Sequence, residues 1–214
     1  MKTIMIVGSH PDDIELGMGG SIRKFADEGH KIIWVELTIG SYTDRSGKPV
    51  RTIEEVMGTK AKLQAMYGFK IYQNLFQETT KAEINKEVIS TLQDLIIDHH
   101  VDEIYTHPEI DTYHQDHRIC HQIVMAAARK YVHNIYCFES IFNICEGIIH
   151  PLLYIEISRE QLDIKLQSLT LHKTEYEKFG TGKWLDNVET LSKMRGVQAG
   201  CLYAEAFQVL KERR

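Results

Sequence analysis

The chain has 214 residues, of which 43% are hydrophobic and 26% charged, and it carries a formal charge of −5 at pH 7. This balance is typical of a globular protein with one hydrophobic core, so we expect a single domain over residues 1–214. An acidic chain without a basic stripe lacks the positive face that phosphate binding needs, which excludes nucleic acid as an expected partner.

Disulfide-bonded and membrane proteins are also disfavoured by the sequence. The four cysteines form no C-x-x-C pair, which indicates neither a disulfide scaffold nor a thiolate zinc site. The N-terminal run MKTIMIVGSHPDD is too short for a signal peptide. No stretch approaches the roughly 18 apolar residues of a membrane span. We therefore expect a cytoplasmic protein with no membrane span.

The N-terminal segment predicts a strand, a helix and a second strand. The apolar run over 3–8 is typical of a strand buried on both faces of a parallel sheet. Helical spacing follows over 19–28 and ends at Gly29, and 30–38 is again rich in β-forming residues. This order is a βαβ unit, whose right-handed crossover brings both strand ends to one edge.

The rest of the chain alternates in the same way. Residues 40–51 are polar and predict a surface loop beside a site. We expect helices over 52–67, 81–98, 117–131, 159–172 and 185–200, and strands over 69–76, 102–107, 134–140 and 152–158. This alternation predicts an α/β protein, a Rossmann-like three-layer α/β/α sandwich with a mostly parallel sheet.

Two clusters of histidine and aspartate follow predicted strands. Ligands and catalysts in open α/β sheets gather at the carboxyl ends of the strands, so we expect the clusters to converge on one edge. The first contains His10, Asp12 and Asp13, and the second contains His107, Asp111, His114, Asp116 and His117.

Imidazole nitrogens and carboxylate oxygens suit zinc or a similar divalent metal, and a catalytic zinc keeps one position open for water. Successive side chains alternate in direction, so one of Asp12 and Asp13 is expected to bind metal while the other faces the substrate. This division suits hydrolysis. A metal lowers the pKa of its water to about 7, a carboxylate takes the proton, and a histidine stabilises the oxyanion and protonates the leaving nitrogen. Glycines 17, 19 and 20 are expected to bring backbone close to the site.

Several motifs together resemble one known family. These are HPDDIELGMGG at 10–20, VELTIG at 35–40, R-x-x-E-E at 51–55, HQDHR at 114–118 and YAEAF at 203–207. In this order they are similar to the PIG-L/LmbE-like zinc-dependent N-deacetylases, over essentially the full chain. One departure is Gln115, where the family more often has proline.

The resemblance implies a role for each matching residue. His10, Asp13 and His117 would bind the metal, which would be Zn²⁺, with Fe²⁺ as an alternative. Asp12 would be the general base, and His114 the oxyanion stabiliser and general acid. Asp116 would orient His114 as a catalytic partner, and Arg51 would contact the substrate.

The function that the resemblance implies is removal of the N-acetyl group from an N-acetylglucosamine-like amino sugar derivative, releasing acetate and a free amine. The partner would be this small molecule, with a glycoside or nucleotide linkage left open, selected by the segment 41–51. The amino sugar, its aglycone and the oligomeric state, a homo-oligomer included, also stay open.

Other interpretations compete with this one. A two-metal phosphoesterase would also use His/Asp clusters, but it needs ligands for a second ion. A non-catalytic nucleotide- or sugar-binding Rossmann-like module would share the βαβ start, although GMGGSI is not G-x-G-x-x-G. The HPDD segment could also be only a turn and helix cap. His117 and His121 are spaced as a helical metal pair, but no H-E-x-x-H glutamate accompanies them, and His121 is expected in the core or on the surface.

Overall fold

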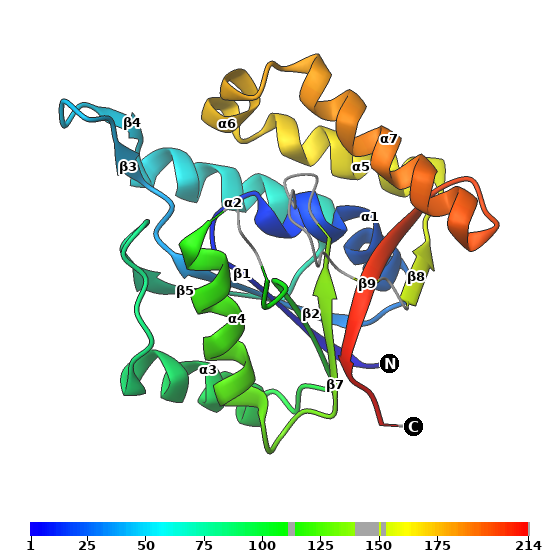
Figure 1. The fold of residues 1–214 in the computed structure, drawn as a ribbon, viewed down its shortest axis with the longest axis horizontal. Helices are drawn as coiled ribbons and strands as arrows, with labels where there is room; N and C mark the ends of the chain where they lie inside the picture. Colours follow the sequence, from blue (N-terminus) through cyan, green and yellow to red (C-terminus); the bar gives the residue numbers. More distant parts are fainter. Residues whose placement is uncertain (111–113, 140–149, 151–152, 214) are drawn as a thin grey trace.

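A computed structural model describes residues 1–110, 114–139, 150 and 153–213 of the chain. Its centre is a seven-stranded sheet with the order β5-β2-β1-β6-β7-β9-β8 (Figure 1). The strands are β1 (Thr3–Gly8), β2 (Lys31–Thr38), β5 (Ile71–Gln77), β6 (Glu103–Thr106), β7 (Asn134–Phe138), β8 (Leu153–Glu156) and β9 (Ala204–Lys211). The first five strands of that order pair in parallel, and β9 is antiparallel to both β7 and β8.

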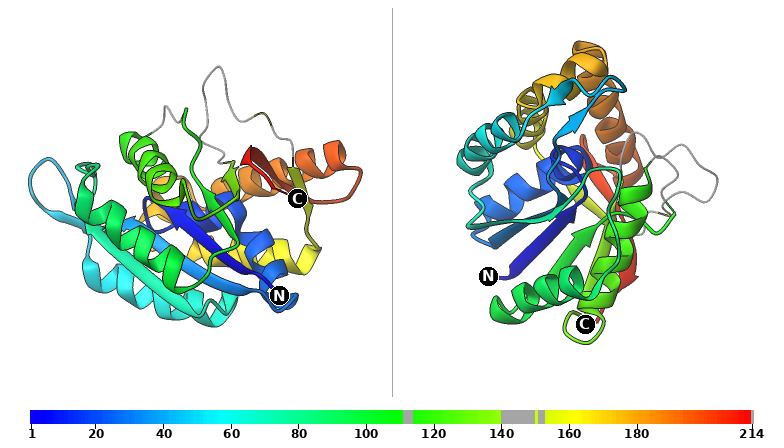
Figure 2. Two further views of the ribbon diagram at one scale, coloured as in Figure 1. Left: turned by 90° about the horizontal axis from the view of Figure 1, so that it is seen from below. Right: turned by 90° about the vertical axis from the view of Figure 1, so that its left-hand side faces the viewer.

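Helices cover both faces of this sheet (Figure 2). They are α1 (Asp13–Asp27), α2 (Ile53–Tyr67), α3 (Lys86–Asp98), α4 (Gln115–Ala128), α5 (Arg159–Thr170), α6 (Lys173–Lys178) and α7 (Gly182–Ala199). One apolar cluster packs α3 and α4 on the sheet, and a second packs α1 and α2 on the opposite face, with α5 against α1. The expected three-layer α/β/α fold with a mostly parallel sheet is confirmed.

Helix α1 begins at Asp13, six residues before the predicted start at residue 19, because Asp12 already accepts the Leu16 N–H on its backbone carbonyl (2.8 Å). The glycines therefore lie inside the helix. A Cβ on Gly17 would lie 2.3 Å from the Phe138 ring, and one on Gly20 would lie 2.5 Å from Ile157. The expectation that these glycines bring backbone to the site is wrong, since they let α1 pack closely on its neighbours.

The YAEAF motif has a structural role beside a break in helix α1. The break lies at Met18, whose φ of −152° is not helical. The break leaves backbone N–H groups without helical partners. The buried Glu205 carboxylate of β9 accepts two of them, from Gly20 (3.1 Å) and Ser21 (2.6 Å), and it pairs with Lys165 Nζ at 2.5 Å. A glutamate from the C-terminal strand thus caps the second half of the first helix.

Several other predicted boundaries change. The segment predicted as a loop over 40–51 contains a short antiparallel hairpin of β3 (Tyr42–Thr43) and β4 (Pro49–Arg51). The residues after 200, for which no helix or strand was predicted, contain the strand β9, and α6 is an additional helix. Asp111, Cys145 and the end of the strand predicted over 134–140 lie outside the described residues. Within the described part of the chain, no helix is both long and apolar enough to cross a membrane.

Candidate metal centre and active site

The two His/Asp clusters meet where β1 and β6 lie side by side. The chain leaves β1 toward β2 on one side, and the later strand β6 pairs with β1 on the other. This reversal of strand order creates the crevice in which open α/β sheets bind ligands. The segment that begins at His10 follows β1, and the segment that leads to His117 follows β6. The predicted convergence of the clusters is therefore confirmed.

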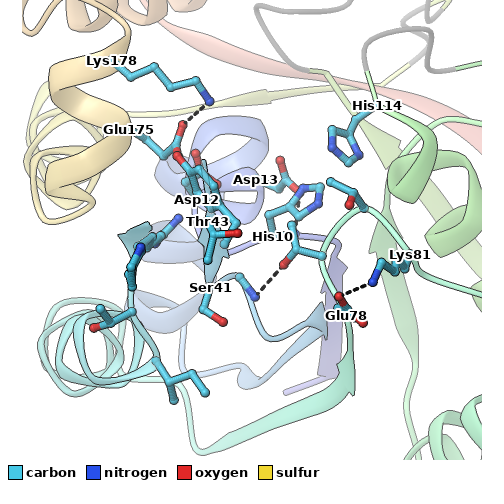
Figure 3. Close-up of a pocket in the computed structure, with 18 of the residues that line it drawn as sticks. His10, Asp12, Asp13, Ser41, Thr43, Glu78, Lys81, His114, Glu175 and Lys178 are labelled. Carbon is cyan, nitrogen blue, oxygen red and sulfur yellow. Dashed lines mark hydrogen bonds and ion pairs between the residues drawn. The ribbon is translucent and has the colours of Figure 1, made fainter. Parts of the chain in front are cut away.

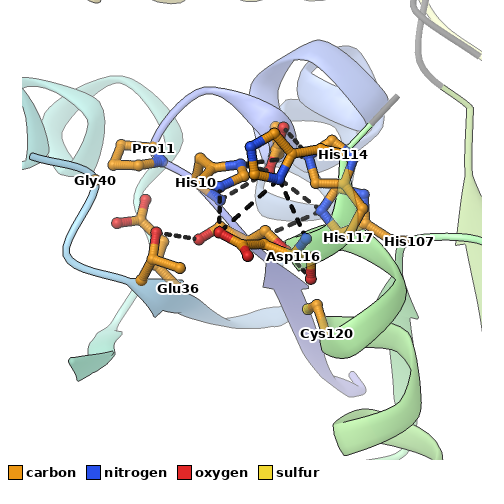
Figure 4. A network of polar contacts seen from close by, with 12 residues as sticks. His10, Pro11, Glu36, Gly40, His107, His114, Asp116, His117 and Cys120 are labelled. Carbon is orange, nitrogen blue, oxygen red and sulfur yellow. Dashed lines mark hydrogen bonds and ion pairs between the residues drawn. The ribbon is translucent and has the colours of Figure 1, made fainter. Parts of the chain in front are cut away.

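The donor groups of His10, Asp13 and His117 form a triangle in this crevice, with one Asp13 oxygen toward each histidine. Figure 4 shows the His10 and His117 rings close together. His10 Nδ1 lies 3.3 Å from His117 Nε2 and 3.3 Å from Asp13 Oδ2, and His117 Nε2 lies 3.3 Å from Asp13 Oδ1. Tetrahedral zinc with bonds of about 2.0–2.1 Å holds its ligands about 3.3–3.4 Å apart. The donor types and their spacing therefore fit a divalent ion of the zinc class.

Asp116 contacts the site differently from the prediction. Its Oδ2 lies 3.1 Å from His10 Nε2 and accepts the Thr80 N–H at 2.7 Å. The same oxygen is 3.9 Å from His114 Nδ1, which instead accepts the backbone N–H of Asp116 (3.1 Å). The carboxylate therefore orients the ring of His10 with Nδ1 turned toward the metal position, an arrangement common behind metal-binding histidines. The expected contact of Asp116 with His114 is therefore made by its backbone N–H, while its carboxylate contacts His10.

His107 offers an alternative donor. Its Nε2 is 3.2 Å from Asp13 Oδ2, and its ring stacks on that of His117. A second donor group of Asp13, His107 and His117 is therefore compact enough for an ion, as is a third of His10, His114 and His117. However, the Ser9 N–H also points at His107 Nε2 (3.1 Å), and a nitrogen that accepts a backbone N–H has no lone pair left for a metal.

His114 lies at the N-terminus of α4 and borders the cavity described below. Burial, together with the neighbouring His10 and His117, lowers the pKa of His114 to about 4. The ring is therefore neutral near pH 7. Because Nδ1 accepts the Asp116 N–H, the ring proton belongs on Nε2, where it can be donated.

Asp12 is a buried carboxylate that makes no side-chain hydrogen bond to any described residue, and in particular no helix-capping bond. A simple capping role for HPDD is therefore not supported. Its backbone has a φ of 143°, a strained value for an L residue. Burial raises the pKa of Asp12, and the negative charges of Asp13 and Glu175 add to this effect while Arg51 opposes it. Such a carboxyl group is better suited to accept a proton than an ordinary aspartate.

A cavity of about 1040 Å³ opens in front of these residues. Its walls come from the β3–β4 hairpin, the start of α2, the segment after β5, and α6. Figure 3 shows Glu175 of α6 next to Asp12 on one side and His114 on the other. Glu175 accepts a hydrogen bond from the Tyr42 hydroxyl (2.8 Å), which joins the hairpin to α6. Glu175 also pairs with Lys178 of the same helix (2.9 Å).

The buried side chain of Arg51 also borders the cavity, where it was predicted to contact substrate. It donates from one terminal nitrogen to the Pro11 carbonyl (3.0 Å), so it holds the turn that carries Asp12. The sequence did not single out Tyr42, although it lies in the segment 41–51 that was predicted to select the substrate, and it did not identify Thr80 or Glu175, because no motif marks them. Only their contacts across the folded chain reveal them.

The chain is similar to a family model and to several known proteins. The model of the family described as GlcNAc-PI de-N-acetylase (PIG-L) matches residues 5–128. The protein named "Uncharacterized deacetylase YaiS" from Escherichia coli (strain K12) is 28% identical over 183 residues, which are 81% of this chain and 91% of that protein. Diacetylchitobiose deacetylase from Thermococcus kodakarensis is 28% identical over 102 residues, which are 44% of this chain and 37% of that protein.

A solved structure has the same fold. The N,N'-diacetylchitobiose deacetylase from Pyrococcus horikoshii superposes with a TM-score of 0.82 at 20% identity, covering 98% of this chain and 84% of that one. The family match begins in β1 and ends with α4, so it spans both His/Asp clusters and the strands that carry them. The chain therefore belongs to the GlcNAc-PI de-N-acetylase (PIG-L) family.

Proposed function

We propose that the protein is a metal-dependent N-deacetylase acting on an N-acetylglucosamine-like amino sugar derivative. The observation that carries this proposal is the triangle of His10, Asp13 and His117 donors beside Asp12, a carboxylate with no hydrogen-bond partner among the described residues. The deacetylases among the relatives, two of them named for diacetylchitobiose, support the acetylated sugar as substrate.

His10, Asp13 and His117 would hold the ion, with zinc first and ferrous iron as the alternative. When bound, such an ion acidifies a water and polarises the amide carbonyl. Asp12 takes the proton that the attacking water loses as its oxygen bonds to the carbonyl carbon. His114 donates a hydrogen bond from Nε2 to the oxyanion. Because a neutral His114 has only this ring proton, the proton held by Asp12 passes to the nitrogen as the C–N bond breaks, which returns Asp12 to its carboxylate form. The products are acetate and a free amine.

A second ion, as a two-metal phosphoesterase needs, has less support. The three compact donor groups all use His117, so they describe competing positions for one ion rather than two separate sites. A nucleotide-binding module also has less support, because the Gly20 and Ser21 N–H groups are occupied by the Glu205 carboxylate. A phosphate would have to displace that carboxylate.

The test is a pair of substitutions with metal analysis and acetate release from N-acetylglucosamine and N,N'-diacetylchitobiose. We expect His10→Ala to lose bound metal, and Asp12→Ala to keep the metal and lose hydrolysis. Near-normal turnover by Asp12→Ala would reject Asp12 as the base. Phosphatase activity with two metal ions per chain would select the phosphoesterase instead.

A further inference from the structure

A row of four buried groups leads from the core to the turn that carries Asp12. Glu15 Oε1 of α1 lies 2.6 Å from His172 Nε2, and His172 Nδ1 lies 2.8 Å from a terminal nitrogen of Arg51. The same Arg51 nitrogen donates to the Pro11 carbonyl at 3.0 Å. Glu15 is fully buried, and His172 and Arg51 are 1% and 3% exposed. The row thus joins α1, the residue before α6, the end of β4 and the HPDD turn.

The chemistry of the row fixes where its protons lie. A guanidinium group only donates hydrogen bonds, so His172 Nδ1 must be the acceptor of the Arg51 contact. The ring proton therefore belongs on Nε2, from which it is donated to the Glu15 carboxylate. A neutral imidazole in this tautomer connects the Glu15 carboxylate to the Arg51 guanidinium. Each buried charge thus has a hydrogen-bond partner in His172.

The last bond of the row acts on the backbone of Asp12. The Pro11 carbonyl belongs to the peptide that precedes Asp12, so rotation of that peptide changes the φ of Asp12. The observed φ of 143° is a strained value that surrounding contacts must hold in place. Arg51 holds the carbonyl oxygen, and Gly40 packs so closely on the proline ring that a Cβ there would lie 2.3 Å from Pro11 Cδ. Arg51 is therefore the polar brace of the peptide that aims Asp12.

One donor of the Arg51 side chain takes no part in this structural role. Its Nε is buried and has no hydrogen-bond partner among the described residues, and its side chain borders the cavity. An arginine that served only to neutralise Glu15 would be expected to have its buried donors paired. One terminal nitrogen is thus committed to His172 and Pro11, while the buried Nε–H has no partner among the described residues.

We propose that His172 is a positioning residue that, anchored by Glu15, holds Arg51 on the Pro11 carbonyl, so that the strained turn presents Asp12 to the cavity. The role of the row in catalysis rests on the proposed deacetylase function. The tautomer of His172 and the contact of Arg51 with the turn do not rest on that function, because both follow from buried contacts of the chain alone.

The first test needs no activity. Long-range ¹H–¹⁵N correlation spectra of the wild-type protein, with the His172 signals assigned through the His172→Gln variant, report which ring nitrogen is protonated. We expect a neutral ring with the proton on Nε2 at pH 7. A proton on Nδ1, or a doubly protonated ring, would overturn the proposal. If every variant at His172 fails to fold, sequential backbone assignment of the wild-type protein identifies the same ring signals.

The second test separates a positioning role from packing. His172→Leu removes both hydrogen bonds, whereas His172→Gln keeps one acceptor and one donor at a spacing close to that of the ring nitrogens. We expect His172→Leu to lower kcat for acetate release from N,N'-diacetylchitobiose about 10-fold or more with metal content unchanged, and His172→Gln to recover most of the loss. His133→Leu, at an exposed histidine, is the matched control. Full activity of His172→Leu, or no recovery in His172→Gln, would overturn the proposal.

A crystal structure of His172→Leu distinguishes failure of this inference from failure of the proposed function. If the wild-type protein releases acetate from no acetylated probe, the proposed function fails, but the structure of the variant still reports on the turn. We expect the Arg51–Pro11 bond to be lost and the φ of Asp12 to leave the value of 143°. An unchanged Arg51 and an unchanged turn would contradict the positioning role.

Discussion

The two sides of the cavity are built in different ways. On the metal side, His10, Asp13 and His117 follow or lie close to the ends of two neighbouring parallel strands, and their donors are within 3.3 Å of one another. On the opposite side, Tyr42 of the hairpin and Glu175 of α6 meet across 133 residues of sequence. The first side is determined by the sheet, while the second consists of added segments joined by the hydrogen bond between Tyr42 and Glu175. We therefore propose that the chemistry lies on the scaffold and that the added segments select the substrate.

The largest expected effect is at Asp12. Asp12→Asn keeps the size of the side chain but cannot accept a proton, so we expect kcat to fall about 10²–10⁴-fold with metal content unchanged. Acetate release and metal analysis on the same preparation check this. The matched variant Asp13→Asn should lose metal, because Asp13 provides a donor of the triangle. Loss of metal in both variants would contradict the division of roles between the two aspartates.

A smaller effect, on metal affinity, is expected at Asp116, which contacts the His10 nitrogen that faces away from the metal position. Asp116→Asn weakens the hydrogen bond that orients His10, and such changes typically cost about 10–100-fold in metal affinity. Competition with a chelator of known affinity measures it. His114→Ala should leave metal affinity within a few-fold of the wild type, since His114 is not in the proposed ligand set. A larger loss in His114→Ala than in Asp116→Asn would favour the alternative group of His10, His114 and His117.

The hairpin side should respond in KM rather than in kcat. Tyr42→Phe removes only the hydroxyl that donates a hydrogen bond to the Glu175 carboxylate. We expect KM for N,N'-diacetylchitobiose to rise about 2- to 10-fold, because a typical intramolecular hydrogen bond contributes roughly 0.5–1.5 kcal/mol. Steady-state kinetics of the variant check this. A fall in kcat at constant KM would show that the hairpin takes part in the chemistry and would remove the contrast between the two sides.

Packing of α1 provides a further contrast. Gly17→Ala places a methyl group 2.3 Å from the Phe138 ring, and we expect a loss of about 1–3 kcal/mol in the free energy of unfolding. Gly58→Ala in α2 meets no heavy atom within 4 Å and should stabilise the protein by about 0.5–1 kcal/mol. Urea unfolding of both variants measures this. Equal effects of the two substitutions would contradict the packing role of Gly17.

The smallest expected effect is on the pH dependence of stability. Burial lowers the pKa of His172, outweighing the opposing influence of Glu15. The unfolded chain then binds a proton at His172 that the native protein does not, so stability falls as pH drops below about 6.5. We expect His172→Gln to show a shallower loss between about pH 7 and 5 than the wild type or His133→Gln in urea unfolding. Parallel curves for all three proteins would contradict a neutral His172.

The sequence predicts one side of the cavity better than the other for a physical reason. His10, Asp12 and Asp13 are adjacent, so the backbone of one turn fixes their relation, and HQDHR likewise lies at one helix start. Strand alternation could also be predicted, and with it the meeting of the clusters. Tyr42, Glu175 and the Glu15–His172 contact depend on how α6 and the hairpin pack, which no local pattern encodes. The glycines of α1 were misjudged because their close neighbours, Phe138 and Ile157, are distant in sequence.

The most direct test of the proposed metal site is a crystal structure of the zinc-loaded protein with anomalous diffraction recorded at the zinc edge. We expect one ion per chain bound by His10 Nδ1, Asp13 and His117 Nε2, with Asp116 on the far nitrogen of His10 and the Asp12 carboxylate facing the cavity. An ion bound through His107 or His114 in place of His10, or a second ion bridged to the first, would contradict it.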